Sequence, residues 1–473
     1  MNMILKKLTS LFGAKDMTVG KPSIRIIEFT IPLIIGNFAQ QLYSTVDSII
    51  VGNYVGDNAL AAVGASLPIF NMIIVLLVGI SMGTSIMVAQ YFGAKRKDEL
   101  SYTVGTTITA TLIASILIMA FGLTLSELVM KLLGTPIEIL SDSVDYLIII
   151  LVGIAGMAYY NILAGVLRGL GDAVMPLLFL IVACLINIGL DLLFVAVFDW
   201  GVKGVGWATI IAQTISAVLC FIRLSKMKDI LYINKDALKP RKFYFKQLLK
   251  LGIPSGLSQA IMSMSMILVQ SVVNSFGPLL ITANTVVMRV DGFAMMPNFS
   301  FGNAMTTYSG QNIGAGKLDR VKRGTKDGLV IGVLTSTTLT ILILVFGENI
   351  LHMFTDTQQV VDVGVSIFKI LAVGYIAVSV TQVLQGVMRG SGDTMTPMII
   401  SLVAIVGLRL PLLYTLIHIS KSDALPNGNY NMIFISLLTV WVFGAIVSAL
   451  VYRVGKWQRK AIIVSKSKAD GVN

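Results

Sequence analysis

Twelve apolar runs, each long enough to cross a lipid bilayer as a helix, dominate the sequence. A helix needs about 20 residues to span roughly 30 Å of hydrocarbon. Only 13% of the 473 residues are charged, against about a quarter in soluble proteins. We therefore predict an all-α integral membrane protein of twelve transmembrane helices. The expected spans are residues 24–50, 59–91, 100–126, 137–166, 174–198, 204–224, 245–275, 281–310, 324–346, 363–388, 396–418 and 430–454.

A segment of the first half recurs in the second half. Residues 165–176 and 386–397 share Gly-Val-x-Arg-Gly-x-Gly-Asp-x-x-x-Pro, and seven of the twelve positions are identical when Gly165 is aligned with Gly386. Each copy contains six spans, an even number, so we predict two six-helix lobes related by a parallel internal repeat. The expected domains are residues 1–232 and 233–473.

The repeated motif falls on the inner connection after the fourth span of each half. Glycine permits tight backbone turns, and proline is tolerated where a helix begins. We therefore interpret Arg168, Asp172, Arg389 and Asp393 as hinge or turn residues, together with Pro32 inside the first span.

Lysine and arginine are distributed unevenly between the connections. With both termini placed on the cytoplasmic side, inner segments hold 30 of the 36 basic residues, and outer loops hold only Lys131, Lys203 and Lys421. This bias follows the positive-inside rule, so bilayer topology explains the net charge of +12. We predict a multi-pass protein of the inner or plasma membrane that has the lipid bilayer, and no nucleic acid, as a partner.

The amino-terminal arm carries apolar Ile4, Leu5 and Leu8 beside Lys6 and Lys7. This pattern is typical of a short helix on the inner membrane surface. The arm has no small-residue cleavage site before the first span, so we do not expect a signal peptide.

Ionisable residues inside spans are costly, roughly 2.5–3.5 kcal/mol at a helix centre, and each is a candidate functional residue. Asp47 ends a polar stripe on the first span, Asn187 and Asp191 share a face of the fifth, and Thr209 begins the sixth. Oxygen ligands of this kind suit a hard cation, and paired buried carboxyl groups can also take up a proton. We predict that Asp47, Asn187, Asp191 and Thr209 surround a single bound cation.

These features resemble the multidrug and toxic compound extrusion (MATE) family. The resemblance rests on Pro32 fifteen residues before Asp47, on Asn187-Ile-Gly-Leu-Asp191, on Thr209, and on Gly-Gln-Asn-Ile-Gly-Ala-Gly at residues 310–316. It covers residues 24–454 and implies an exporter of organic cations and drugs driven by inward proton or sodium flow. It also implies that the four predicted ligands match the amino-lobe cation site of some members. Members with a carboxy-lobe sodium site carry acidic residues on spans seven and ten, and this sequence has none there.

Polar and flexible side chains on spans one, seven and eight are candidates for a substrate cavity. Methionine suits a cavity that accepts many shapes, and Asp291 can attract a cationic substrate, carry a second proton or only hold helices together. The candidates are Asn37, Gln40, Gln41, Gln259, Ser263, Gln270, Asn284, Met288, Arg289, Asp291 and Met295.

The sequence does not predict an enzyme. It has only His352 and His418, and no His-Glu-x-x-His or nucleophile motif. We predict a monomeric secondary active antiporter that exports small amphipathic or cationic drugs or toxins in exchange for protons or sodium ions, with no other cofactor. The alternative is a flippase for lipid-linked precursors, which would need a strongly cationic cavity, whereas Arg289 and Arg409 are the arginines within spans.

Overall fold

The computed structural model describes residues 14–423 and 425–462. The predicted surface helix at residues 4–12 lies outside this part. The described helices are α2 (Pro22–Tyr54), α3 (Asp57–Gly93), α4 (Lys97–Leu132), α5 (Ile137–Val152), α6 (Ile154–Gly169), α7 (Val174–Asp191), η1 (Leu192–Val197), α8 (Gly201–Ser225), α9 (Lys242–Asn274), α10 (Pro278–Gly314), α11 (Leu318–His352), α12 (Gln358–Leu371), α13 (Gly374–Gly390), α14 (Met395–Leu402), η2 (Val403–Arg409), α15 (Leu410–Ile419), α16 (Asn431–Val454) and η3 (Lys456–Arg459).

The helices confirm the predicted twelve-span, all-α fold. Within the described residues, ten helices are long and apolar enough to cross a membrane, and two bent pairs bring the number to twelve. The α5 and α6 pair bends by 51°, and the α12 and α13 pair by 45°. The second helices of the pairs begin at Ile154 (α6) and at Gly374 (α13). When Gly165 is aligned with Gly386, Gly374 corresponds to Gly153, the residue directly before α6. The internal repeat therefore extends to the position of the helix break.

Two compact units divide the chain. Residues 14–16 and 31–256 belong to unit 1, and residues 17–30 and 257–462 belong to unit 2. Helix α2 passes from unit 2 to unit 1 after Thr30, and α9 passes from unit 1 to unit 2 after Gly256. Each helix carries a proline near that point, Pro32 or Pro254. The domain boundary at residues 232 and 233, and a hinge at Pro32, stay predictions.

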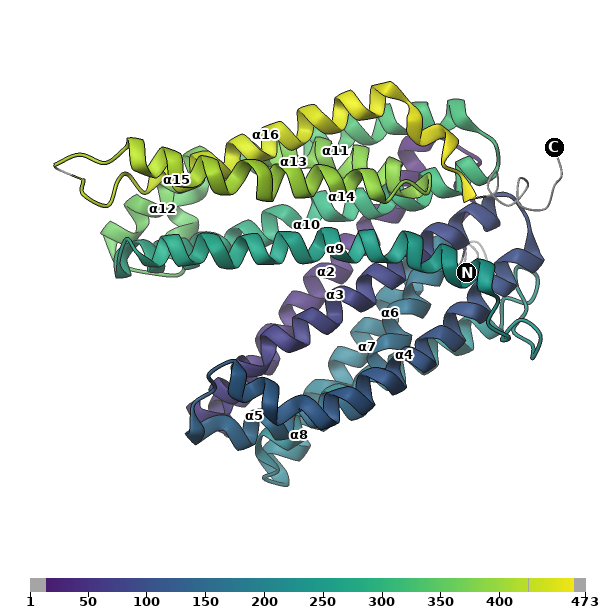
Figure 1. The fold of residues 1–473 in the computed structure, drawn as a ribbon, viewed down its shortest axis with the longest axis horizontal. Helices are drawn as coiled ribbons and strands as arrows, with labels where there is room; N and C mark the ends of the chain where they lie inside the picture. Colours follow the sequence, from purple (N-terminus) through teal and green to yellow (C-terminus); the bar gives the residue numbers. More distant parts are fainter. Residues whose placement is uncertain (1–13, 424, 463–473) are drawn as a thin grey trace, which may run out of the picture. The chain divides into compact units, whose positions relative to one another are not determined.

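Each unit is a helical bundle with its own apolar core. In unit 1, α3 packs against α4, α5 and α6, while α8 packs against α5, α6 and α7 (Figure 1). In unit 2, α13 packs against α10, α11 and α16. Apolar side chains also remain exposed along the outer helices, as Phe121 on α4 and Leu334 on α11 show. Exposed apolar residues are expected where a helix faces lipid.

The first half of α9 approaches α3 closely through glycines within unit 1. A Cβ atom at Gly79 would lie 2.6 Å from the Cα of Gly256, and one at Gly83 would lie 2.8 Å from the backbone nitrogen of Gly252. The two helices thus meet through a Gly-x-x-x-Gly pattern on each, which is how membrane helices bring their backbones together.

Both copies of the repeated motif fold as the same turn. Gly171 and Gly392 adopt positive φ angles of 86° and 94°, which L side chains rarely adopt. In the first copy the Asp172 amide donates to the Leu167 carbonyl and the Gly171 amide to the Arg168 carbonyl, both at 2.9 Å. This is a Schellman motif, and it ends α6 and α13 in the same way.

The aspartates of the two turns then begin the next helices. Asp172 Oδ1 accepts from the Met175 amide at 3.1 Å, and Asp393 Oδ1 accepts from the Thr396 amide at 3.2 Å. Arg223 pairs with Asp172 at 3.4 Å, and Lys460 pairs with Asp393 at 3.3 Å. Each turn is thereby linked by an ion pair to a basic side chain from another part of the chain. The arginines of the motif bind other groups: Arg168 donates to Ser81 Oγ and Arg389 to Gln382 Oε1, each at 3.4 Å.

Candidate cation site

Two carboxyl groups meet inside unit 1. Asp47 lies on α2, and Asp191 is the last residue of α7, directly before the π-helical segment η1. The two carboxyl groups lie within hydrogen-bonding reach of each other. Asp191 is fully buried. π-Helical segments often accompany functional sites, so the sequence prediction and the local backbone indicate the same position.

Asn187 and Thr209 complete the group. When the Asn187 side-chain amide is turned so that its nitrogen and its oxygen both have partners, the nitrogen donates to Asp191 Oδ2 at 2.8 Å and the oxygen accepts from the Thr209 backbone nitrogen at 3.2 Å. Asn187 is fully buried and Thr209 is 8% exposed. The structure therefore brings together all four residues that the sequence predicts as cation ligands.

Two oxygens of this group have no partner in the described part of the chain. They are Oδ1 of Asp47 and Oδ1 of Asp191, both buried. A buried acceptor without a partner costs about 1–3 kcal/mol, and two facing carboxylates also repel each other. A proton shared between the carboxyl groups, or a cation held by their oxygens, relieves both costs. The geometry is suited to binding one small cation reversibly.

A buried cluster of apolar residues and one tyrosine lies on one side of the site. Val51, one helical turn beyond Asp47, packs in a buried cluster with Tyr146, Val195 and Ile210. This cluster brings residues of α2, α5, η1 and α8 together beside the carboxyl pair. It keeps that side of the site dry, and charge interactions are stronger where water is excluded.

Unit 2 contains a different polar group. The Tyr375 hydroxyl on α13 donates to Asp291 Oδ1 on α10, and both residues are buried. On the same helix, Asn298 donates to the Tyr375 carbonyl at 3.3 Å and accepts from Ser336 of α11 at 2.8 Å. This network joins α10, α11 and α13 by hydrogen bonds.

The predicted cavity residues differ widely in exposure. Asn284 is buried and donates to Gln270 Oε1 at 3.2 Å, and Gln270 donates to Asn274 at 2.9 Å. Met295 packs against the apolar core of unit 2. The candidates that face outward within their own units are Gln40, Gln41, Gln259, Ser263, Met288 and Arg289, while Asn37 is half-buried.

Arg409 ends the π-helical segment η2 and is buried. Its Nη1 donates to Ser265 Oγ of α9 at 2.6 Å, and its Nε has no partner among the described residues. The described part of the chain contains no carboxylate within ion-pair distance of it. One arginine of this kind does not make a strongly cationic cavity.

The sequence model of the MatE family matches residues 32–193 and 254–415. These ranges cover more than half of the chain and contain Asp47, Asn187 and Asp191. The chain belongs to the MATE family. The predicted relationship is therefore confirmed, as is the prediction of a transporter rather than an enzyme.

Curated MATE relatives resemble the chain over most of their length. A protein named probable multidrug resistance protein YoeA from Bacillus subtilis is 32% identical over 414 residues, covering 86% of this chain and 89% of the relative. A protein named probable multidrug resistance protein NorM from Thermotoga maritima is 24% identical, covering 93% and 95%. Multidrug export protein MepA of Staphylococcus aureus is 22% identical, covering 78% and 82%.

Solved structures share the MATE fold. A MATE transporter crystallised with MaL6 has a TM-score of 0.85 at 24% identity and covers 96% of this chain and 99% of its own. A MOP superfamily transporter from Pyrococcus furiosus has a TM-score of 0.85 at 23% identity, covering 94% and 98%. These likenesses support the two-lobe, twelve-span architecture.

Sequence reasoning missed several residues of the two groups. Tyr43 lies one turn before Asp47 and within hydrogen-bonding reach of Thr209, and its i−4 spacing from Asp47 was a usable signal. Tyr146 and Tyr375 gave no comparable signal, because an aromatic residue in an apolar span usually packs. Their roles depend on which helices become neighbours.

Proposed function

We propose that this MATE protein is a secondary active multidrug exporter. It exchanges amphipathic, often cationic, organic compounds for protons or sodium ions. The names of YoeA, NorM and MepA, which describe multidrug resistance or export, support the substrate class. The facing carboxyl groups of Asp47 and Asp191, each with an unpartnered buried oxygen, are the observation that carries ion coupling.

The chemistry of coupling follows from these oxygens. When a cation binds, the two carboxyl groups can stay together and Asn187 keeps its bonds to Asp191 and Thr209. When the cation leaves, repulsion between the carboxylates favours their separation. Because Asp47 is on α2 and Asp191 is on α7, ion occupancy sets how these two helices pack. A transporter needs such a link between ion binding and helix position.

Substrate contact is the second part of the proposal. Gln40 and Gln41 on α2, and Gln259 and Ser263 on α9, are exposed polar side chains within apolar spans. We propose that the exposed polar side chains of each unit are available to polar groups of the exported compound, whereas Asn284 and Met295 support the bundle of unit 2. The protein acts as a monomer in the cell membrane with both termini cytoplasmic, and it uses no cofactor besides the coupling ion.

The test is efflux of a fluorescent organic cation from vesicles containing the purified protein. A proton gradient and a sodium gradient are imposed separately on wild type, Asp47→Asn and Asp191→Asn. The matched control is Asp142→Asn, because Asp142 is an exposed aspartate on α5 outside the site. One gradient should drive efflux in wild type and control, and both site variants should lose the response.

Two results would contradict the proposal. Gradient-driven efflux that survives both site substitutions would remove the coupling role of the carboxyl pair. An absence of dye movement under either gradient, in protein shown to be inserted, would remove the exporter and make the lipid-precursor flippase the next function to test.

A further inference from the structure

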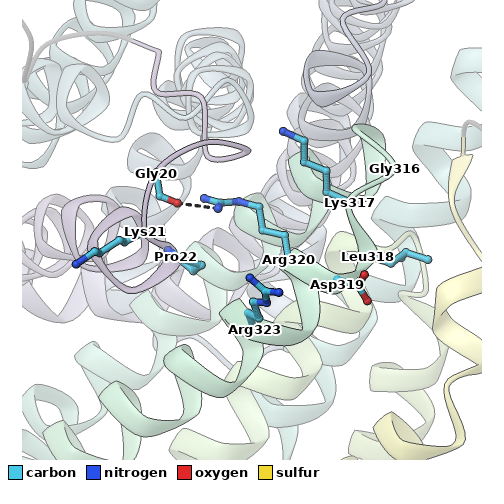
Figure 2. A pocket seen from close by; sticks show the side chains of 9 residues that line it. All are labelled: Gly20, Lys21, Pro22, Gly316, Lys317, Leu318, Asp319, Arg320 and Arg323. Atoms are coloured by element: carbon cyan, nitrogen blue, oxygen red, sulfur yellow. Dashed lines mark hydrogen bonds between the residues drawn. The ribbon is translucent and has the colours of Figure 1, made fainter.

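A cationic cavity of about 560 Å³ lies in unit 2, at the end of α10 and the beginning of α2 and α11. Four of its lining side chains are basic and one is acidic. Figure 2 shows how they surround the space. The lining residues are Gly20, Lys21, Pro22, Gly316, Lys317, Leu318, Asp319, Arg320 and Arg323.

Two of the four cations hold the wall of the cavity. Arg320 donates to the Gly20 carbonyl at 2.7 Å, and also to the carbonyls of Val19 and Met17 at 3.0 and 3.1 Å. Lys317 Nζ donates to the Thr18 carbonyl at 3.0 Å. These bonds fasten the segment before α2 onto the α10–α11 turn. They use the donors of Arg320 and Lys317 but leave their positive charge inside the cavity.

The other two cations are free. Within the described chain, the side chains of Lys21 and Arg323 have no hydrogen-bond or ion-pair partner, and both are exposed. The first turn of α11 also opens here without a side-chain cap, and a helix N-terminus favours negative charge. Asp319 is the one acidic residue among those that line the cavity. The cavity therefore has two unpaired cations and a net positive lining.

The corresponding turn of unit 1 shows that this surplus is not a general property of the fold. Residues 95–102 hold three basic and two acidic residues, whereas residues 316–323 hold four basic and one acidic. Glu99 stands where unit 2 has Arg320, and it pairs with Arg96 at 3.5 Å. Lys97 donates to the Lys228 carbonyl at 2.7 Å. Tyr102 stands where unit 2 has Arg323.

We propose that the unit 2 cavity binds the phosphate-bearing headgroup of an anionic glycerophospholipid. Lys21 and Arg323 contact the phosphate, and the charges of Lys317 and Arg320 strengthen the attraction. Basic cavities at the ends of membrane helices are suited to such headgroups. Leu318 lines the cavity, and Ile24 and Ile27 follow Lys21 and Pro22 along the chain on α2; all three side chains are exposed. They provide an apolar surface for acyl chains, which free phosphate would not need.

Bound lipid would stabilise the attachment of the segment before α2, because that segment forms one wall of the cavity. This inference does not depend on the transported compound or on the coupling ion. It is tested without a transport assay, so its failure and that of the proposed function are separate results.

The experiment measures thermal unfolding of the full-length protein in detergent with increasing dioleoylphosphatidylglycerol. Dioleoylphosphatidylcholine and inorganic phosphate are added in parallel. The variant is Lys21→Gln/Arg323→Gln, and Arg323→Gln alone is a milder second variant. The matched control is Lys322→Gln/Lys326→Gln, which removes two exposed charges from α11 outside the cavity.

We expect phosphatidylglycerol to raise the melting temperature of wild type and control. Half-saturation should need about thirtyfold more lipid in the double cavity variant, from the typical contribution of two basic residues near an anionic surface. The lipid concentration for half-saturation of Arg323→Gln alone should lie between those of wild type and the double variant. An equal response in all proteins, or an equal response to phosphatidylcholine, would overturn the proposal. If inorganic phosphate raises the melting temperature of wild type but not of the cavity variants, and phosphatidylglycerol has no effect, lipid is rejected as the ligand and the site is assigned to free phosphate.

Discussion

The polar groups of the two units differ in what their carboxyl groups contact. In unit 1, Asp47 and Asp191 face each other, and an oxygen of each lacks a partner in the described chain. In unit 2, Asp291 accepts from the Tyr375 hydroxyl. A donor satisfies the single carboxyl group in unit 2, whereas the pair in unit 1 needs a cation or a proton from outside. We propose that this difference separates an ion-binding role in unit 1 from a structural role in unit 2.

The internal repeat makes this comparison sharper. When Gly165 is aligned with Gly386, the second-repeat positions that correspond to the three polar residues Asp47, Asn187 and Asp191 hold Leu268, Leu408 and Leu412. The first-repeat positions that correspond to Asp291 and Tyr375 hold Phe70 and Ile154. Each polar group therefore has apolar counterparts in the other repeat. The two repeats therefore share a fold without sharing either polar group.

The largest expected difference is between Asp191→Asn and Asp291→Asn. Under the proposed coupling, asparagine at 191 removes one of the two charges that would bind the cation, so ion-driven efflux should fall at least about a hundredfold, or roughly 2.7 kcal/mol. Asparagine at 291 can still accept from Tyr375, so efflux should fall less than about threefold. Initial efflux rates in vesicles, normalised to inserted protein, measure both.

Equal losses of efflux in Asp191→Asn and Asp291→Asn would contradict the proposed difference between the two units. In that case Asp291 would also carry an ion or meet the substrate, which are the alternatives that the sequence leaves open for it. A loss confined to Asp291→Asn would place coupling in unit 2 instead.

Tyr375→Phe should affect stability more than transport. It leaves the buried carboxyl group of Asp291 without the tyrosine donor, which costs about 1–3 kcal/mol. Tyr414→Phe is the control, because Tyr414 is exposed. Unfolding of the purified protein by dodecyl sulfate titration gives the free energies. An unchanged stability would show that the tyrosine hydroxyl does not hold the unit together, and that Asp291 has another partner.

The sequence predicted the spans and the pairing of Asn187 with Asp191 well because both depend on short-range patterns. Apolar run length sets the spans, and Asn187 and Asp191 share one helical face. Their meeting with Asp47 followed from the family resemblance as much as from chemistry. The sequence could not predict the pairing of Asp291 with Tyr375, since the sequence of α10 does not specify which residue of α13 it contacts. The passage of α2 and α9 between units likewise depends on tertiary packing.

The comparison of repeats extends to the inner turns, where a smaller pH effect is expected. Burial raises the pKa of Asp172, although the Met175 amide and Arg223 act in the opposite direction. A carboxyl group with a raised folded pKa stabilises the protein below its unfolded pKa, about 3.9, and this contribution is lost as pH rises through the folded pKa.

Asp172→Asn removes that titration. The variant should therefore gain stability relative to wild type as pH rises from about 4. Unfolding midpoints of both proteins, measured at half-unit steps up to pH 7, check the sign. If the stability of the variant relative to wild type instead falls as pH rises, the Arg223 ion pair outweighs burial in setting the pKa of Asp172.

The smallest effect is expected at the edge of the unit 1 group. Thr209→Val removes the hydroxyl that lies within hydrogen-bonding reach of Tyr43, and membrane hydrogen bonds average about 0.6 kcal/mol. The ion concentration for half-maximal efflux should rise about threefold. Tyr43→Phe should have a similar effect, and the double variant should add little, because both substitutions remove one shared bond. A hundredfold change at Thr209, equal to that at Asp191, would instead make its hydroxyl a direct ligand of the cation.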